Sequence, residues 1–245
     1  MNRSVSIALC AFVGLQLEAQ SPVQPKVIGR SDIELIIKEY ILSHPEVVGE
    51  AWRRLQEKGV SDQRRQISER VAVVLPELNS SVSTVTVIAF VDYQCGYCKQ
   101  LDQILFRVGT QHTAVKVVFH ELPILGVKSI SAARAALAAE AQGQYERYHR
   151  ALMDLTEPMS NEVLAREAKR IGLDMAQFDQ HWKSRQGEDR LQKDLELSRQ
   201  LGVDVTPTLI IGNEVIVGIV SEEELAKYIE AAREAQRKRT AVKGK

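Results

Sequence analysis

The sequence predicts an α/β domain that contains a helical insertion and is preceded by a helical N-terminal arm. Residues 83–92, STVTVIAFVD, form an unbroken apolar and β-branched run, which is typical of a buried central strand. Most of residues 128–201 has the apolar spacing of helices. A second β-rich stretch, TPTLIIGNEVIVG at 206–218, follows them. Strands on both sides of a block of helices indicate one α/β domain with an insertion.

Composition sets few limits on function. The 245 residues suffice for one domain plus an appendage. Lys and Arg together number 32, as do Asp and Glu, so the formal net charge is zero. This balance gives no support for a nucleic-acid partner.

The first residues, 1–19, have the features of an export signal. A basic start, MNR, precedes the apolar run SVSIALCAFVGLQL, which is too short to span a bilayer as a helix. Cys10 lies within this run, and its neighbour Leu9 is larger than a lipidation signal requires, so we expect Cys10 to be removed with the signal. The exported chain would then hold only Cys95 and Cys98, in an oxidising compartment.

Residues 20–75 are predicted to form a helical arm and linker. Two apolar stripes follow helical spacing, interrupted by Pro45, and Gly59 is expected to end the second helix. The stripes consist of Ile33, Ile37, Tyr40 and Ile41, and of Val47, Val48, Ala51, Trp52 and Leu55. The arm holds little that could bury them, so they either pack on the main domain or self-associate. We favour self-association into a dimer or trimer through residues 31–57.

The main domain is predicted to span residues 76–240, with its helical insertion at about 127–201. A helix should follow the first strand, and residues 114–122, AVKVVFHEL, should form a second buried strand. The stretch after residue 206 reads as a hairpin that turns at Gly212 and Asn213. Ser221 and Glu224 should cap the last helix, whose inward face would consist of Leu225, Tyr228, Ile229 and Ala232.

The sequence CGYC at residues 95–98 allows three interpretations. A structural zinc site usually needs four Cys or His ligands, and the five histidines lie singly along the chain. A disulfide that closes so short a loop would stabilise the fold only weakly. A reacting pair fits best, because Cys95 would lie at a helix N-terminus, where the dipole favours a thiolate, and Cys98 would lie one turn later on the inner side. No metal or other cofactor is expected.

The second candidate feature is the dipeptide Thr206–Pro207. A proline at the start of a strand removes a ladder donor, and a cis peptide bond would explain its presence there. We therefore predict a cis bond at this position.

Taken together, FVDYQCGYC, the helical insertion and TPTLIIG resemble thioredoxin-fold proteins of the DsbA type. With the arm and FHELPILG included, the chain more closely resembles the periplasmic proteins of the ScsC and Com1 type, which have an N-terminal oligomerisation region. The resemblance implies that Cys95 is the nucleophile, Cys98 the resolving thiol, and Thr206 and Pro207 a wall that holds substrate. It also implies a bacterial periplasm, exported protein substrates with cysteines, and a DsbD-like reductant or DsbB-like oxidant in the membrane.

Two departures from the family pattern bear on the chemistry. The buried carboxylate often found six residues before the first cysteine is replaced by Ala89, and the nearest acids in sequence are Asp92 and Glu121. The dipeptide between the cysteines, Gly96–Tyr97, brings no positive charge and resembles that of periplasmic disulfide isomerases. Isomerase or reductase activity is therefore favoured, with a DsbA-like oxidase and a copper-binding, copper-tolerance protein as alternatives.

Overall fold

The computed structural model describes residues 29–75, 84–111 and 114–243. The predicted signal at residues 1–19 lies outside the described residues. The chain divides into two compact units, Met1–Arg53 and Arg54–Lys245. The expected arm boundary at residue 75 therefore lies inside the second unit.

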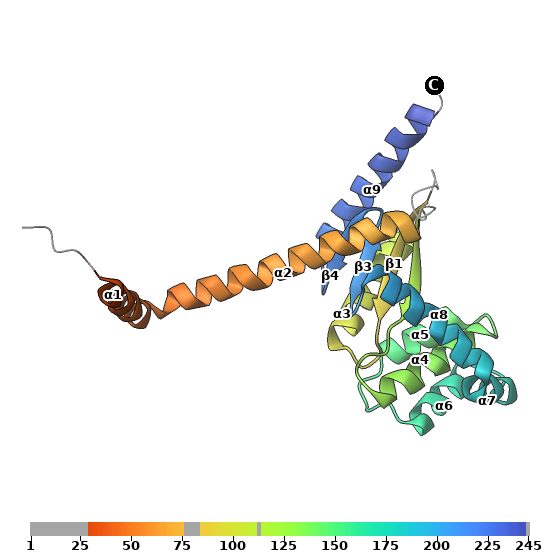
Figure 1. Cartoon of the computed structure of the whole chain (residues 1–245). Coiled ribbons are helices and arrows are strands. Elements are labelled where there is room, and N and C mark those ends of the chain that lie inside the picture. Colours follow the sequence, from red (N-terminus) through yellow and green to blue (C-terminus); the bar gives the residue numbers. More distant parts are fainter. Residues whose placement is uncertain (1–28, 76–83, 112–113, 244–245) are drawn as a thin grey trace, which may run out of the picture. The chain divides into compact units, whose positions relative to one another are not determined.

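The elements follow the order expected from the sequence (Figure 1). The helices are α1 (Arg30–Ser43), α2 (Pro45–Val74), α3 (Gly96–Gln111), α4 (Val127–Glu140), α5 (Tyr145–Met153), α6 (Asn161–Arg170), α7 (Met175–Lys183), α8 (Arg185–Leu201) and α9 (Glu222–Lys243). The strands are β1 (Val85–Val91), β2 (Val115–Glu121), β3 (Thr208–Ile211) and β4 (Glu214–Val217).

The first unit contains α1 and the start of α2, and its predicted apolar stripes are exposed. None of the α1 residues is buried, and Ile37 and Trp52 keep 52% and 62% of their surface accessible. The helices meet at Pro45, which opens α2 because a first helical residue needs no backbone donor.

Helix α2 continues through Gly59 as far as Val74, so the prediction that Gly59 ends the helix is wrong. A glycine inside a helix costs only about 1 kcal/mol relative to alanine. Contacts further along the helix offset this cost, because Ile67 and Val71 are fully buried against the sheet and Ser68 Oγ donates to the Asn213 carbonyl at 2.6 Å. The end of α2 is thus part of the core of the second unit.

The four strands form one mixed sheet in the order β2-β1-β3-β4. Strand β1 runs parallel to β2, with Val85 opposite Val115, and antiparallel to β3, with Val87 opposite Ile211. Strands β3 and β4 form the predicted hairpin, where Gly212 takes a φ of 61° that favours glycine.

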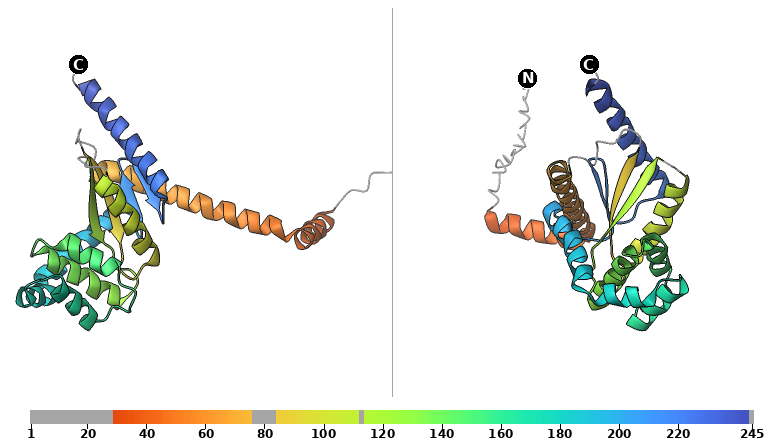
Figure 2. Two further views of the ribbon diagram at one scale, coloured as in Figure 1. Left: turned by 180° about the vertical axis from the view of Figure 1, so that it is seen from behind. Right: turned by 90° about the vertical axis from the view of Figure 1, so that its right-hand side faces the viewer.

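Strand β1 is buried on both faces, as its unbroken apolar run predicts. Val87 and Ala89 face a core cluster with α3 and α9, whereas Ile88 and Phe90 face a second cluster with α2 and the end of α8. This alternation follows from the two-residue period of a strand. Figure 2 shows the sheet between these helices.

Strand β2 forms as predicted, but it lies at the edge of the sheet and is only partly buried, so the expectation of a second buried strand is correct for the strand and wrong for its burial. Val115 and Glu121 are buried, while the residues between them are exposed or half-buried. The apolar run did not reveal this position, because an edge strand and a central strand can share the same composition.

The predicted helical insertion consists of five helices, α4 to α8. Helices α4 to α7 gather at one end of the sheet (Figure 1). Helix α4 packs against α5, α7 and α8 through alanines that are almost completely buried, which are Ala132, Ala135, Ala136 and Ala139. Small side chains let the helix axes approach closely and leave no room for a larger residue.

We expect Ala135→Leu to lower the free energy of unfolding by about 1–3 kcal/mol, because the added carbons overpack the α4 interface. Urea unfolding followed by circular dichroism measures the change. Ala141→Leu at the exposed C-cap of the same helix is the matched control and should stay near wild type. Equal stability of the two variants would contradict this description of α4.

Candidate active site

Residues 92–98, which include CGYC, form the redox turn that joins the end of β1 to the start of α3. The Cys95 N–H donates to the Asp92 carbonyl at 3.0 Å, and the Cys95 carbonyl accepts from the Lys99 N–H at 3.2 Å. Cys95 therefore occupies the N-cap position of α3, as the sequence predicts.

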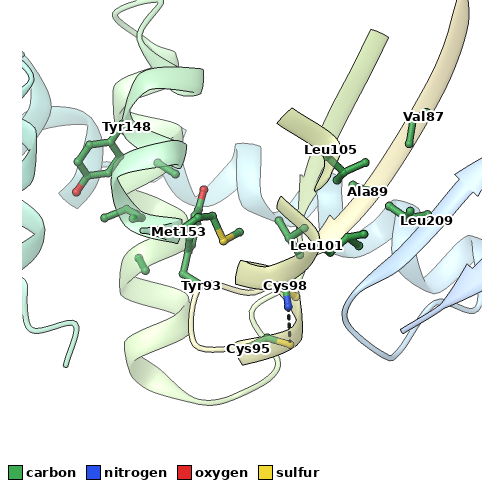
Figure 3. Close-up of a cluster of buried hydrophobic side chains, with 14 of the residues drawn as sticks. Val87, Ala89, Tyr93, Cys95, Cys98, Leu101, Leu105, Tyr148, Met153 and Leu209 are labelled. Atoms are coloured by element: carbon green, nitrogen blue, oxygen red, sulfur yellow. Dashed lines mark hydrogen bonds between the residues drawn. The ribbon is translucent and has the colours of Figure 1, made fainter. Parts of the chain in front are cut away.

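The two sulfur atoms differ in their surroundings. The Cys98 N–H donates to Cys95 Sγ at 3.4 Å, so this sulfur takes the place that a side-chain oxygen usually has at an N-cap (Figure 3). Cys95 is 7% exposed and Cys98 1%, so both are buried and Cys95 is the more open of the two. Burial raises the pKa of the Cys98 thiol well above its ordinary value.

The Thr206–Pro207 peptide bond is cis, as predicted. The Cys95 thiol donates to the Thr206 carbonyl at 3.5 Å, which places this dipeptide beside the redox turn. The Pro207 carbonyl accepts from the Gly218 N–H at 2.8 Å, so the β3–β4 hairpin holds the dipeptide in place.

The residues between the cysteines lie at the surface. Gly96 is exposed, and Tyr97 keeps 62% of its surface accessible. Two of the predicted site residues, Cys95 and Thr206, are thus in direct contact, and Tyr97 is open to a partner molecule.

The buried Asp92 carboxylate stabilises the turn by accepting main-chain hydrogen bonds, a role that the sequence did not reveal. Its carboxylate accepts from the Gln94 N–H at 2.8 Å and from the Leu125 N–H at 3.0 Å. These bonds tie the residues before Cys95 to the loop after β2. Asp92 is 1% exposed, so its carboxylate depends on these donors.

Glu121, at the end of β2, belongs to a second buried polar group. Its Oε1 accepts from the Tyr93 hydroxyl at 2.8 Å and from the Tyr145 hydroxyl at 2.7 Å. The Tyr93 hydroxyl also lies 2.8 Å from His149 Nδ1, and His149 Nε2 lies 3.1 Å from Asp102 Oδ1. The sequence alone indicated Glu121 only as a nearby acid, because its hydrogen-bond partners Tyr93 and Tyr145 lie in the turn before α3 and on α5.

The carboxyl group of Glu121 is completely enclosed. Burial raises its pKa to about 8, and the tyrosine hydrogen bonds oppose this shift only in part. Within the described part of the chain, Glu121 Oε2 is buried without a hydrogen-bond partner. A neutral carboxylic acid is therefore the stable form of this group near neutral pH.

Two further findings concern ligands and membranes. Across residues 29–75, 84–111 and 114–243, no three His, Cys, Asp or Glu side chains gather as they would to hold a metal ion. Among the helices described, none combines the length and apolar character needed to cross a bilayer.

The fold and the cysteine pair define a thioredoxin-fold protein with a helical insertion, and comparison with known proteins specifies the family. The family model described as a DSBA-like thioredoxin domain matches residues 86–230, more than half of the chain. The chain therefore belongs to this family, as the sequence features predicted.

Several solved structures are similar. A thioredoxin-like oxidoreductase from Silicibacter pomeroyi is 33% identical, with a TM-score of 0.58 over 61% of this chain and 87% of its own. The thiol-disulfide exchange protein alpha-DsbA2 from Wolbachia pipientis is 26% identical, with a TM-score of 0.61 over 67% of this chain and 95% of its own. Proteus mirabilis ScsC, at 24% identity and a TM-score of 0.60 over 84% of this chain and 97% of its own, shares the fold.

The curated relatives are much longer proteins. The Na(+)/H(+) antiporter NhaA 3 of Salinispora tropica and NhaA 1 of Salinispora arenicola are each 29% identical over 150 residues. The match covers 60% of this chain but only 23% of either antiporter. Similarity to these proteins thus concerns one segment of their sequences.

The raised pKa of Glu121 predicts a pH-dependent stability. Because the folded value is about 8 and the ordinary value 4.5, the folded protein binds this proton more tightly than the unfolded chain. The resulting stabilisation, up to about 5 kcal/mol, is fully present below the ordinary value and is lost as the pH rises through 8. Glu121→Gln removes this titration, so its urea midpoint should fall less than that of wild type between pH 5 and 8.5. Parallel pH curves would contradict the assignment.

Proposed function

We propose that the chain is a thiol–disulfide oxidoreductase in which Cys95 is the nucleophile and Cys98 the resolving thiol. The Cys95 thiolate attacks a substrate disulfide, forms a mixed disulfide and releases one substrate thiolate. Cys98 then loses its proton and attacks Cys95 Sγ, which releases the second substrate thiolate and leaves a Cys95–Cys98 disulfide. Two electrons pass from the cysteine pair to the substrate, and a membrane redox partner resets the pair.

The hydrogen bond from the Cys98 N–H to Cys95 Sγ is the observation that carries this proposal. It places one sulfur where backbone donors and the dipole of α3 stabilise negative charge. The other sulfur is enclosed, and its pKa is raised. Such an asymmetric pair is what ordered attack and resolution need.

Substrate would lie against Gly96, Tyr97 and Thr206, beside the buried Pro207. Tyr97 offers an exposed ring next to Cys95. The Thr206 carbonyl accepts the hydrogen bond of the Cys95 thiol. A substrate disulfide that approaches Cys95 would therefore pass next to this carbonyl. These positions suit an extended, cysteine-containing segment of an exported protein.

We favour isomerase or reductase activity over oxidase activity. The Gly96–Tyr97 dipeptide adds no positive charge beside Cys95, so it should not strongly favour the thiolate at the expense of the disulfide. The proposed setting is the periplasm, with a DsbD-like reductant as partner and a DsbB-like oxidant as the alternative.

We further propose that residues 31–57 join two or three copies of the chain. This proposal is supported by the exposure of the arm's apolar side chains in a single chain, among them Ile33, Ile37, Val48 and Trp52. Burial of each such side chain contributes roughly 1.5–3 kcal/mol, enough in sum to offset the entropy of association. Linked domains would act on one misfolded client at a higher effective concentration.

In the reduced protein, iodoacetamide should label Cys95 faster than Cys98 at pH 7, as read by peptide mass spectrometry. Cys98→Ser should accumulate mixed disulfides with a disulfide-containing substrate, because the resolving thiol is absent. Cys95→Ser should form none and serves as the matched control. Faster labelling of Cys98, or trapping by Cys95→Ser, would reverse the two roles.

Light scattering should show that the exported chain is a dimer or trimer at micromolar concentration. A chain that begins at Arg54 should be a monomer that still folds, because it keeps Ile67 and Val71 in the core. That monomer should keep Cys95 reactive and lose reactivation of scrambled ribonuclease. A monomeric full-length protein would remove the support for the arm's role and for isomerase activity.

A further inference from the structure

Two neighbouring residues of the redox turn reach the interior in different ways. Asp92 accepts from the main-chain N–H groups of Gln94 and Leu125, whereas the Tyr93 ring lies in the core cluster that also contains Cys95 and Cys98. Tyr93 is 1% exposed and lies two residues before Cys95. Figure 3 shows its side chain among the core residues next to the cysteine turn.

We propose, on the basis of the function proposed above, that Glu121 is a positioning residue for Cys95. It acts through the Tyr93 hydroxyl, and its proton sets how firmly the redox turn is held. Glu121 does not touch the reacting sulfur atoms, so its effect on thiol exchange is conformational.

The geometry gives Glu121 one fully used oxygen and one unused oxygen. Oε1 accepts both tyrosine hydroxyls, at 2.8 and 2.7 Å, while Oε2 is buried without a partner in the described chain. The neutral acid loses less in this arrangement, because it places no charge on the buried Oε2. The carboxylate does not, because a buried charge without a donor loses its hydration without compensation.

Ionisation of Glu121 would therefore favour an opening that lets water reach Oε2. Such an opening must move the side chains that enclose Oε2. Because the Tyr93 hydroxyl bonds the same carboxyl group, the opening would also shift the redox turn. A shift of Tyr93 would in turn weaken the hydrogen bond from the Cys98 N–H to Cys95 Sγ.

The groups that face Glu121 support this local response. Asp92, after β1, and Asp194, on α8, both disfavour its charge. The charge of Asp194 is itself compensated, because it lies 2.7 Å from His120 Nδ1 and accepts from Arg190 at 2.6 Å. The titratable neighbours are Asp92 and Tyr93 from the turn, His120 from β2, Tyr145 and His149 from α5, and Arg190 and Asp194 from α8.

The test is the rate at which iodoacetamide labels Cys95 in the reduced, full-length protein between pH 5 and 9.5. The wild-type rate profile should contain an inflection near pH 8 that arises from Glu121. Glu121→Gln should lack that inflection, because it cannot ionise. Tyr93→Phe keeps the ring but removes the hydroxyl that bonds Glu121, so this variant should also lack the inflection. Its labelling rate should differ from that of wild type roughly two- to tenfold, the range of one hydrogen bond.

Tyr148→Phe is the matched control. Tyr148 is an equally buried tyrosine on α5, but its hydroxyl donates to the Leu164 carbonyl at 2.8 Å, away from Glu121. This variant should keep the wild-type inflection, even if it loses a similar amount of stability.

The outcomes separate this inference from the proposed function. If Cys95 is labelled no faster than Cys98 in wild type, the proposed nucleophile is wrong. If Cys95 is reactive but Glu121→Gln and Tyr93→Phe keep the wild-type inflection, the role of Glu121 is overturned and the proposed function stands. A loss of the inflection in Tyr148→Phe as well would also overturn it, because the effect would then reflect general destabilisation.

Discussion

The position of Cys95 at the N-cap of α3 is the constraint on which the candidate site depends. Its sulfur accepts the Cys98 N–H that an N-cap oxygen would otherwise accept, and its own N–H donates to the Asp92 carbonyl. The central strand β1 fixes where this turn begins, and Leu101 and Leu105 anchor α3 against the sheet. The two thiols thus differ because one caps a helix and the other is enclosed beneath it.

The neighbouring polar groups extend this constraint into the insertion. Asp92 ties the turn to the loop after β2, and Glu121 links the Tyr93 hydroxyl to Tyr145 on α5. The same Tyr93 hydroxyl also contacts His149 of α5 directly. The helical insertion is therefore more than a cover for one end of the sheet, because α5 supplies partners for the turn. The position six residues before Cys95 holds Ala89, so the buried acid of this site comes from a different strand.

Local patterns predicted much of the fold, whereas tertiary placement escaped them. The apolar run of β1, the Gly212 hairpin and the Ser221–Glu224 capping box report on neighbouring residues, and the structure contains all three. Gly59 was misread because the contacts that hold α2 helical lie further along the chain. The edge position of β2 and the Tyr93–Glu121–Tyr145 group depend on segments far apart in sequence, which spacing alone does not bring together.

The central claim is that Cys95 and Cys98 form a reversible redox pair, and equilibration of the full-length protein with glutathione buffers tests it most directly. The disulfide fraction, read by alkylation and mass spectrometry, should follow a single two-electron transition. Its potential should lie well below the roughly −120 mV of the strong oxidant DsbA. Absence of a reversible Cys95–Cys98 disulfide would contradict the redox assignment, and a potential close to that of DsbA would contradict the isomerase or reductase preference.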